Sequence, residues 1–234
     1  MVSRDAVGPT ALIVLTKAPI PGTVKTRLCP PMTPDEAASL HGSLVLDALE
    51  KAQGLNGVTL YVSCAPDPAH PFFKVLEGRF GARLLPQEGV DLGGRMFDAM
   101  HQAFSFGHQR VILIGTDLPS LTRAQVSQAV TQLGTHDLVL GPTLDGGYYL
   151  IAVSRPTPEL FRGIVWSTAT VLEETLQKAA AAGLSVALLP TLRDLDDLDD
   201  LTAFITMAGK DKSLSKRTAG VLRLIGERLK ARVS

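Results

Sequence analysis

Apolar and polar positions along the chain follow two patterns, short apolar runs typical of buried strands and longer segments with helical spacing. The apolar runs predict strands at residues 11–16, 58–63, 82–85, 111–115, 137–140, 148–153 and 184–189. The segments between them favour helices at about residues 34–54, 69–79, 91–106, 123–133 and 168–182. Such alternation predicts a single doubly wound, mostly parallel sheet with helices on both faces, which is an α/β fold.

Capping residues indicate where the helices begin. Thr33 precedes a proline and two acidic residues, which is a strong start for the first helix. Thr122 is a better cap for its helix than Asp117, and Ser167 is the simplest cap for the helix that follows it. Trp166, beside that cap, is interpreted as a lid or a core residue.

No repeat, linker or low-complexity segment divides the 234 residues, so we expect residues 1–234 to form one domain with a substantial core. Residues 213–233 mix basic and apolar side chains and predict a C-terminal amphipathic helix. Such a helix can bind an anionic membrane surface, but packing on its own domain is the favoured interpretation.

Composition narrows the class of protein. The 23 basic and 23 acidic residues balance, so nothing in the net charge points to nucleic acid as a partner. The two cysteines, Cys29 and Cys64, cannot build a disulfide framework. No apolar run approaches the length of a membrane span, and the N-terminus is unlike a signal sequence, so we expect a cytoplasmic protein. Composition does not address the oligomeric state.

The candidate chemistry starts with Asp117. It follows the apolar run at residues 111–114 in the segment Gly-Thr-Asp-Leu-Pro. Ligands of open α/β sheets bind beyond the carboxyl ends of strands, where this carboxylate is expected to lie. It is suited to hold a divalent cation against a phosphate-bearing substrate. The alternative is that Asp117 only caps the next helix.

The loop after the first predicted strand carries three cations, Lys17, Lys25 and Arg27. Pro21 and Gly22 hold this loop in a defined shape. Clustered cations of this kind are suited to a di- or triphosphate. The loop is not a Walker A motif, because a valine rather than a glycine precedes Lys25. Solvated surface lysines are the alternative interpretation.

Two further loops follow predicted strands. Residues 86–96 are glycine-rich and open a helix, which suits an anion or the edge of a base. Residues 141–149 contain Asp145, Gly146 and Gly147, which either form a simple hairpin turn or accept a sugar or other acceptor.

The acidic segment at residues 193–201 lacks the glycine of an EF-hand loop. Most of its acids are expected to form a solvated helix start. One of them, Asp196 or Asp194, is a candidate to reach the cation held by Asp117. The five histidines show no metal-ligand spacing, and no serine-hydrolase elbow is present.

Several motifs in this order resemble one family. They are Lys-x-Pro-x-Pro-Gly-x-x-Lys-Thr-Arg-Leu, Gln-x-Gly-x-Asp-Leu-Gly-x-Arg-Met, Gly-Thr-Asp-Leu-Pro, Asp-Gly-Gly-Tyr-Tyr-Leu-Ile and a closing Asp-Leu-Asp. The chain resembles the bacterial nucleotide-diphospho-sugar transferase-like proteins, which have the glycosyltransferase A-type fold. The Lys-Thr-Arg-Leu segment is also similar to the Lys-Ser-Arg-Leu of phospholactate guanylyltransferases.

The resemblance implies a nucleotide bound across the carboxyl edge of the first half of the sheet. Lys17, Lys25 and Arg27 would face its phosphates. The residues implied to line the nucleotide further along the chain are Gln87, Gly93 and Arg95. Asp117 would hold Mg²⁺ or Mn²⁺, with one carboxylate where the transferases have an Asp-x-Asp motif, and Asp196 would complete the site.

We therefore predict a metal-dependent transferase with a nucleotide-activated donor and a small-molecule acceptor. The favoured activity is glycosyl transfer from a nucleotide-diphospho-sugar, with Lys25, Asp117 and Asp145 as catalytic residues. The residues predicted to contact the acceptor or the sugar are Asp145, Gly146, Gly147 and Trp166. Two alternatives stay open: nucleotidyl transfer from a nucleoside triphosphate to a small phosphorylated acceptor, and a nucleotide-binding module without catalysis.

Overall fold

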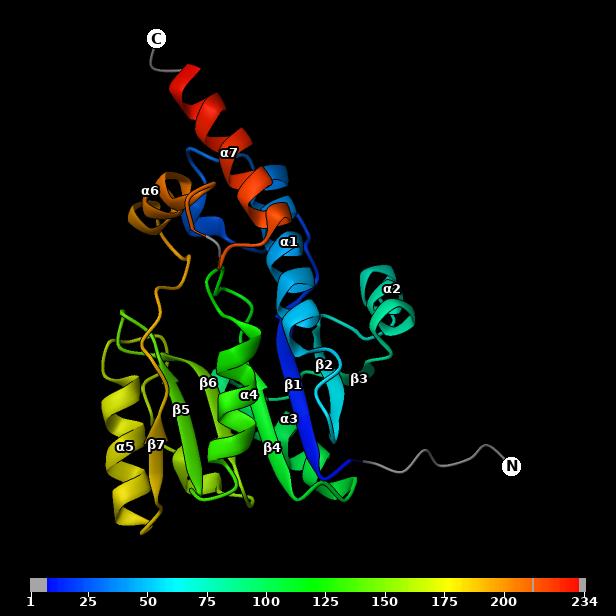
Figure 1. Cartoon of the computed structure of the whole chain (residues 1–234), viewed down its shortest axis with the longest axis vertical. Helices are drawn as coiled ribbons and strands as arrows, with labels where there is room; N and C mark the ends of the chain where they lie inside the picture. The colour runs from blue at the N-terminus through cyan, green and yellow to red at the C-terminus, as the bar shows by residue number, and fades with distance from the viewer. Residues whose placement is uncertain (1–7, 212, 232–234) are drawn as a thin grey trace.

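The computed structural model describes residues 8–211 and 213–231, and its centre is a seven-stranded sheet in the order β3-β2-β1-β4-β6-β5-β7 (Figure 1). Each apolar run predicted to be a strand forms one of them. The strands are β1 (Thr10–Lys17), β2 (Val58–Ala65), β3 (Arg83–Pro86), β4 (Arg110–Ile114), β5 (Leu138–Pro142), β6 (Tyr148–Val153) and β7 (Val186–Leu188).

Helices cover both faces of the sheet, which confirms the predicted fold class. The helices are α1 (Pro34–Ala52), α2 (Pro71–Phe80), α3 (Leu92–Ser105), α4 (Arg123–Gln132), α5 (Val171–Ala181), α6 (Leu198–Met207) and α7 (Lys216–Ala231), with short 3-10 turns η1 (Thr26–Leu28) and η2 (Pro158–Leu160). Alternate residues of β1 point to opposite sides. Leu12 and Val14 pack with α1, α2 and α4, whereas Ala11 and Ile13 pack with α3 and α5.

One strand runs against the others. β6 pairs antiparallel with both β4 and β5, while the pairs β1–β2, β1–β4, β2–β3 and β5–β7 are parallel. The reason is the short turn at residues 143–147, because two strands joined by so few residues can only pair antiparallel. The segment Asp-Gly-Gly is therefore a hairpin turn, one of the two interpretations that its residues allowed.

Helix starts follow the capping residues in two cases and depart from them in a third. Thr33 and Thr122 each form a complete capping box at the start of α1 and α4. The predicted cap at Ser167 is wrong, because α5 begins at Val171 and Thr170 precedes it. Ser167 instead has a left-handed backbone with φ of 64°, so the chain turns there before it enters the helix.

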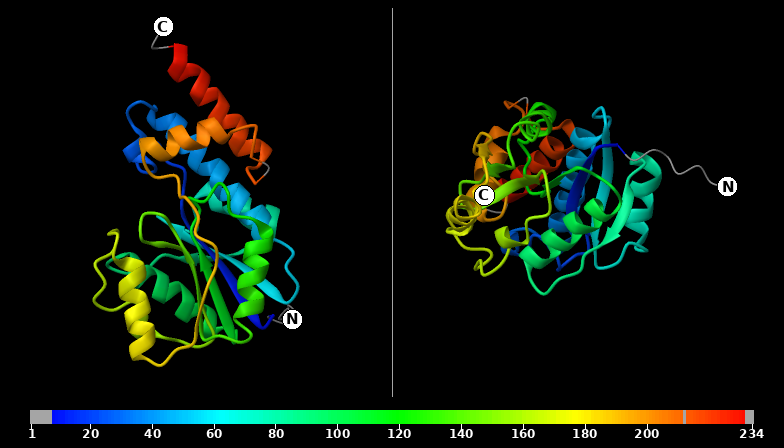
Figure 2. Two further views of the ribbon diagram at one scale, coloured as in Figure 1. Left: turned by 60° about the vertical axis from the view of Figure 1, so that its left-hand side comes forward. Right: turned by 90° about the horizontal axis from the view of Figure 1, so that it is seen from below.

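A third apolar cluster lies beyond the sheet, where α6 and α7 pack on the first half of α1 (Figures 1 and 2). The buried carboxylate of Asp47 on α1 accepts hydrogen bonds from Ser215, Arg217 and Thr218 at 2.5–2.6 Å. The predicted C-terminal helix thus packs on its own chain; its last predicted residues, 232 and 233, lie outside the described residues. No helix of the described residues is both long enough and apolar enough to cross a bilayer.

Candidate active site

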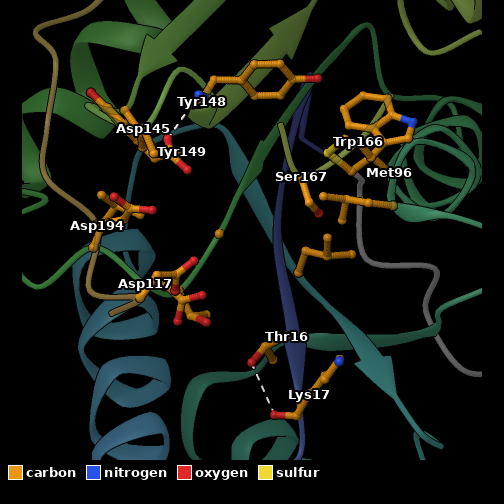
Figure 3. Close-up of a pocket in the computed structure, with 18 of the residues that line it drawn as sticks. Thr16, Lys17, Met96, Asp117, Asp145, Tyr148, Tyr149, Trp166, Ser167 and Asp194 are labelled. Atoms are coloured by element: carbon orange, nitrogen blue, oxygen red, sulfur yellow. Dashed lines mark hydrogen bonds between the residues drawn. The ribbon is translucent and has the colours of Figure 1, made fainter. Parts of the chain in front are cut away.

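A cleft of about 590 Å³ opens at the carboxyl ends of β1 and β4 (Figure 3). It is bounded by the β1–α1 loop, the start of α3, the β5–β6 hairpin, residues 166–168 and the segment before α6. In Figure 3, Asp117, Asp145 and Asp194 lie along one side, with Met96 and Trp166 across from them. Parallel strands direct these loops to one edge, which is where open α/β sheets bind ligands.

Most of the residues that the motifs single out line this cleft. Those that line it are Lys17, Lys25, Arg27, Gln87, Arg95, Asp117, Asp145, Gly147, Trp166 and Asp196. Four predicted site residues do not line it, namely Pro21, Gly22, Gly93 and Gly146. These four shape the backbone around the cleft. Gly146 has φ of 88°, and a Cβ there would collide with the backbone of Ala169.

An ion cluster joins two of the predicted metal ligands. The Nζ atom of Lys25 lies 2.7 Å from Oδ1 of Asp117 and 2.8 Å from Oδ1 of Asp196. It also donates to the backbone oxygen of Leu195 at 2.5 Å. The ammonium thus donates hydrogen bonds to Asp196 and Leu195 and forms an ion pair with Asp117. The two aspartates, 79 positions apart along the chain, therefore converge on one cation.

Burial and charge set the protonation of this cluster. The Lys25 side chain is only 4% exposed, whereas those of Asp117 and Asp196 are 39% and 43% exposed toward the cleft. Burial alone lowers the pKa of Lys25, but the two aspartates outweigh it and hold the pKa above its usual value. Burial alone raises the pKa of Asp117, yet Lys25 and then His41 hold it below its usual value. Lys25 and Asp117 are therefore both charged at neutral pH.

The side of the cleft formed by the β1–α1 loop and α3 is cationic. Lys17, Arg27 and Arg95 line it, and none of them forms an ion pair with another described residue. Gln87 also lines the cleft, and its amide nitrogen donates to the backbone oxygens of Thr16 and Ser63 at 2.7 and 2.8 Å. Its amide oxygen is left to accept from a ligand.

The opposite side, formed by the β5–β6 hairpin and the segment before α6, is acidic. Asp145 accepts from Thr143 at 2.5 Å and from the backbone of Gly147 at 3.0 Å. Burial, together with the charges of Asp145 and Asp196, raises the pKa of Asp194 to about 7. No lysine or arginine from this side lines the cleft within the described part of the chain. The cleft is therefore divided by charge.

Trp166 lies between the cleft and the apolar cluster that packs on α3. Its ring stacks on Phe161 at 6.4 Å and meets Tyr148 edge-on at 6.5 Å between centroids. It also lies directly against Gly93, where a Cβ would overlap the indole. Gly93 thus makes room for Trp166 rather than lining the cleft, and Trp166 both lines the cleft and packs against the core, which was one of its two interpretations.

His41 on α1 is a cleft residue that the sequence patterns did not identify. Its side chain is buried, and its Nε2 atom lies 3.0 Å from the backbone oxygen of Lys17 and 3.4 Å from Oγ1 of Thr16. Its Nδ1 atom has no hydrogen-bond partner in the described structure. The signal in the sequence was a histidine among the apolar positions of the predicted helix, and a search for metal-ligand spacing does not detect it.

The predicted metal ligands are close to one another but do not form a completed metal site. Within residues 8–211 and 213–231, no group of three or more His, Cys, Asp or Glu side chains is arranged to hold a metal ion. Two carboxylates converge here, those of Asp117 and Asp196, and the Lys25 ammonium occupies the position between them.

The chain is similar to several known proteins. A family model described as "Uncharacterized protein conserved in bacteria (DUF2064)" matches residues 48–168. A phosphoenolpyruvate guanylyltransferase of Sphaerobacter thermophilus is 33% identical over 125 residues, which are 51% of this chain and 56% of that protein. A 2-phospho-L-lactate guanylyltransferase of Methanothermobacter thermautotrophicus is 27% identical over 190 residues, 77% of this chain and 78% of that protein. The first of these alignments covers little more than half of the relative's length.

A solved structure matches nearly the whole chain. It is a protein of Desulfovibrio desulfuricans G20 whose name provisionally assigns it to the nucleotide-diphospho-sugar transferases. The two chains are 32% identical with a TM-score of 0.85, and the match covers 96% of this chain and 98% of the other. The resemblance inferred from the motifs is thereby confirmed for both the transferase-like fold and the guanylyltransferase relatives.

Proposed function

Because the chain belongs to the DUF2064 family of proteins conserved in bacteria, we propose that it is a glycosyltransferase that uses a nucleotide-diphospho-sugar and a hydroxyl-bearing acceptor. Similar proteins are named for guanylyl transfer and for nucleotide-diphospho-sugar transfer. Both activities need a nucleotide-activated donor. They differ in what the second half of the cleft must recognise, and that difference guides the proposal.

The observation that carries the proposal is the division of charge across the cleft. Lys17, Arg27 and Arg95 supply cations on the donor side, which suit a diphosphate. On the other side, Asp145 and Asp194 face the same space with no lining cation from their half of the described cleft. Carboxylates accept hydrogen bonds from hydroxyl groups and repel phosphates. This side therefore favours a sugar or another polyol over a phosphorylated acceptor.

The chain's own residues account for the main requirements of glycosyl transfer. Donor phosphates would lie against the cationic loop, and the sugar would lie between Trp166 and the acidic side. Asp145 or Asp194 would accept the proton that the acceptor hydroxyl loses as it attacks the sugar carbon. The nucleoside diphosphate leaves as the new bond forms, and the cations stabilise the charge that develops on it.

A divalent cation, Mg²⁺ or Mn²⁺, fits the pair of carboxylates that Lys25 contacts. Asp117 and Asp196 already direct one oxygen each at a single cation, the Lys25 ammonium. Their oxygens are the hard ligands that these ions prefer. We assign the ion to Asp117 and Asp196, and when bound it would neutralise charge on the leaving diphosphate.

Nucleotidyl transfer is the second candidate, and the names of the curated relatives favour it. In that reaction a nucleoside triphosphate would occupy the cationic side, and an acceptor phosphate would attack its α-phosphate with loss of pyrophosphate. The unpaired Lys17 and Arg27 suit a triphosphate as well as a diphosphate. The acidic second half of the cleft is the feature that argues against a phosphorylated acceptor.

The released product distinguishes the two reactions. Purified protein is first screened by thermal shift against nucleoside triphosphates and nucleotide-diphospho-sugars with Mn²⁺. The donors that bind are then incubated with a panel of sugars and of sugar phosphates. We expect nucleoside diphosphate from a sugar nucleotide; pyrophosphate from a triphosphate would establish nucleotidyl transfer instead. Binding without either product would indicate a nucleotide-binding module.

A pair of variants tests the assignment of the acidic side. Asp145→Asn is expected to lower turnover while nucleoside diphosphate affinity stays unchanged, because Asp145 lies away from the cationic loop. Asp199→Asn is the matched control, since Asp199 is an exposed acid in the first turn of α6 and does not line the cleft. Equal turnover in both variants would remove Asp145 from the mechanism.

A further inference from the structure

The buried ammonium of Lys25 occupies the place between the two carboxylates assigned to the cation. We propose that Lys25 and the divalent cation compete for the same oxygens of Asp117 and Asp196, so that the cation binds well only together with a nucleotide whose phosphates accept Lys25. This inference rests on the cation site of the proposed function and adds an order of events to it. Lys25 thereby acts as a positioning residue that couples the two ligands.

The geometry makes the two cations exclusive. Lys25 lies 2.7 and 2.8 Å from the carboxylate oxygens and is almost completely buried behind them. A Mg²⁺ ion bound to those oxygens requires distances of about 2.0–2.1 Å to each. Such an ion would stand within a few ångströms of the ammonium, and like charges at that separation repel strongly in a partly buried site. One cation has to leave.

The same contacts explain why the free protein retains Lys25. Its ammonium donates to Asp196 and to the backbone oxygen of Leu195, and it forms an ion pair with Asp117. The ammonium therefore contacts both carboxylates at once and offsets one of their two negative charges without an external ion. Among the ion pairs of the described residues, no other lysine or arginine contacts either of these aspartates.

The position of Lys25 also provides a destination for the displaced ammonium. Lys25 precedes η1 in the loop that carries Lys17 and Arg27, and all three line the cleft. Its backbone has φ of 50° and ψ of 36°, a left-handed conformation that is uncommon for a residue with a side chain. Phosphates held by Lys17 and Arg27 would accept Lys25 as it leaves the carboxylates. Nucleotide and cation would then strengthen each other's binding.

Titration with Mn²⁺ in the absence of nucleotide tests the competition without any turnover. The concentration of free Mn²⁺ is measured by electron paramagnetic resonance. Lys25→Met removes the competing ammonium and is expected to bind Mn²⁺ about tenfold or more tightly than wild type, within the usual range for coupled sites. Lys25→Gln, which keeps a hydrogen-bond donor at this buried position, is expected to change in the same direction. Unchanged or weaker Mn²⁺ binding in both variants overturns the proposal.

Lys17→Met is the matched control, because it removes one positive charge from the same cleft without touching the aspartate pair. We expect it to change Mn²⁺ affinity by about twofold or less, since an exposed charge is screened by salt. An equal gain in Lys17→Met and Lys25→Met would mean that general electrostatics, not competition for the same oxygens, sets the affinity.

A measurement on the wild-type protein covers the case in which the Lys25 variants do not fold. With ¹⁵N-labelled lysine, the ammonium resonance of Lys25 should leave its free-protein position when Mg²⁺ and a nucleoside diphosphate are added together. A Lys25 resonance that keeps its free-protein chemical shift in the fully bound protein overturns the proposal. The proposed function would fail on its own if no donor were turned over while Mn²⁺ still displaced Lys25 from the two aspartates.

Discussion

Replacing Gly93 with alanine would place a methyl group on ring atoms of Trp166. The built Cβ overlaps Cε2, Cζ2 and Nε1 of the indole. Carbon atoms in contact ordinarily lie about 3.5–4.0 Å apart, so the indole has to move by more than about 1 Å. Gly93 is buried at the start of α3, and the neighbouring backbone cannot easily give way. The expected result is displacement of Trp166 from its place beside α3.

The energetic cost is the difference between two effects. Overpacking of a well-packed site costs about 1–3 kcal/mol. Exchanging glycine for alanine in a helix returns about 1 kcal/mol. The net loss of stability is then about 1 kcal/mol, which for a chain of this length lowers Tm by about 2–4 °C. The change in Tm is small, so a local probe of the indole is needed.

Fluorescence provides that probe, because Trp166 is the one tryptophan in the sequence. In wild type the ring packs on Phe161 and Tyr148, and its Nε1 atom is buried. We expect the emission of Gly93→Ala to shift to longer wavelength and to be quenched more readily by acrylamide. Donor affinity should fall at the same time, since Trp166 lines the cleft.

Gly94→Ala is the control for this experiment. A Cβ at Gly94 meets Oδ1 of Asp91 at 3.3 Å and Cα of Gly89 at 3.4 Å, contacts that a small shift relieves. This variant should keep the wild-type emission and gain the helix propensity of alanine. Wild-type emission and quenching in Gly93→Ala as well would refute the argument, since it would show that Trp166 does not rest on Gly93.

Three further results are expected. Asp47→Ala should lower the free energy of unfolding, measured in urea, by about 3 kcal/mol, because it leaves Arg217 without its buried partner. Asp35→Ala, at the exposed start of α1, is the control and should cost much less. Equal losses of stability in the two variants would contradict the role of Asp47. Burial holds the pKa of His108 below its usual value, so the unfolded chain takes up protons first and the wild type should lose stability as the pH falls below about 6.5. His108→Gln should show a shallower pH dependence in the same urea titrations, and an unchanged slope would contradict this. Lys17→Met should weaken nucleoside diphosphate binding about tenfold by calorimetry, as expected for a lost charge-assisted hydrogen bond; unchanged affinity would mean that Lys17 is only a solvated surface lysine.

Local patterns were sufficient to predict the elements of the fold. Buried parallel strands such as β4 are continuous apolar runs, and the caps at Thr33 and Thr122 depend on residues within one helical turn. The failure at Ser167 has a physical cause. A serine before a helical pattern satisfies the local requirement for a cap. In the structure the backbone turns left-handed at Ser167 and Thr168 donates back to the carbonyl of Val165, so α5 begins only at Val171.

The candidate site was predictable where it depended on loops after strands. The carboxyl ends of parallel strands share one edge, so Asp117 and the cationic loop could be placed together from their positions alone. The direction of each side chain could not be predicted in this way. Lys25 was expected to face phosphates, whereas in the structure it binds Asp117 and Asp196. His41 went unnoticed because its neighbours in the cleft are distant in sequence.

The sequence by itself determined which elements form, which loops meet at the binding edge and which family the chain resembles, because each of these depends on local order along the chain. Only the tertiary structure decided how the charges pair. It brings Lys25 between two aspartates 79 residues apart and separates a cationic from an acidic side of one cleft. Electrostatic contacts depend on distances of a few ångströms, and these are set by the packing of the whole chain.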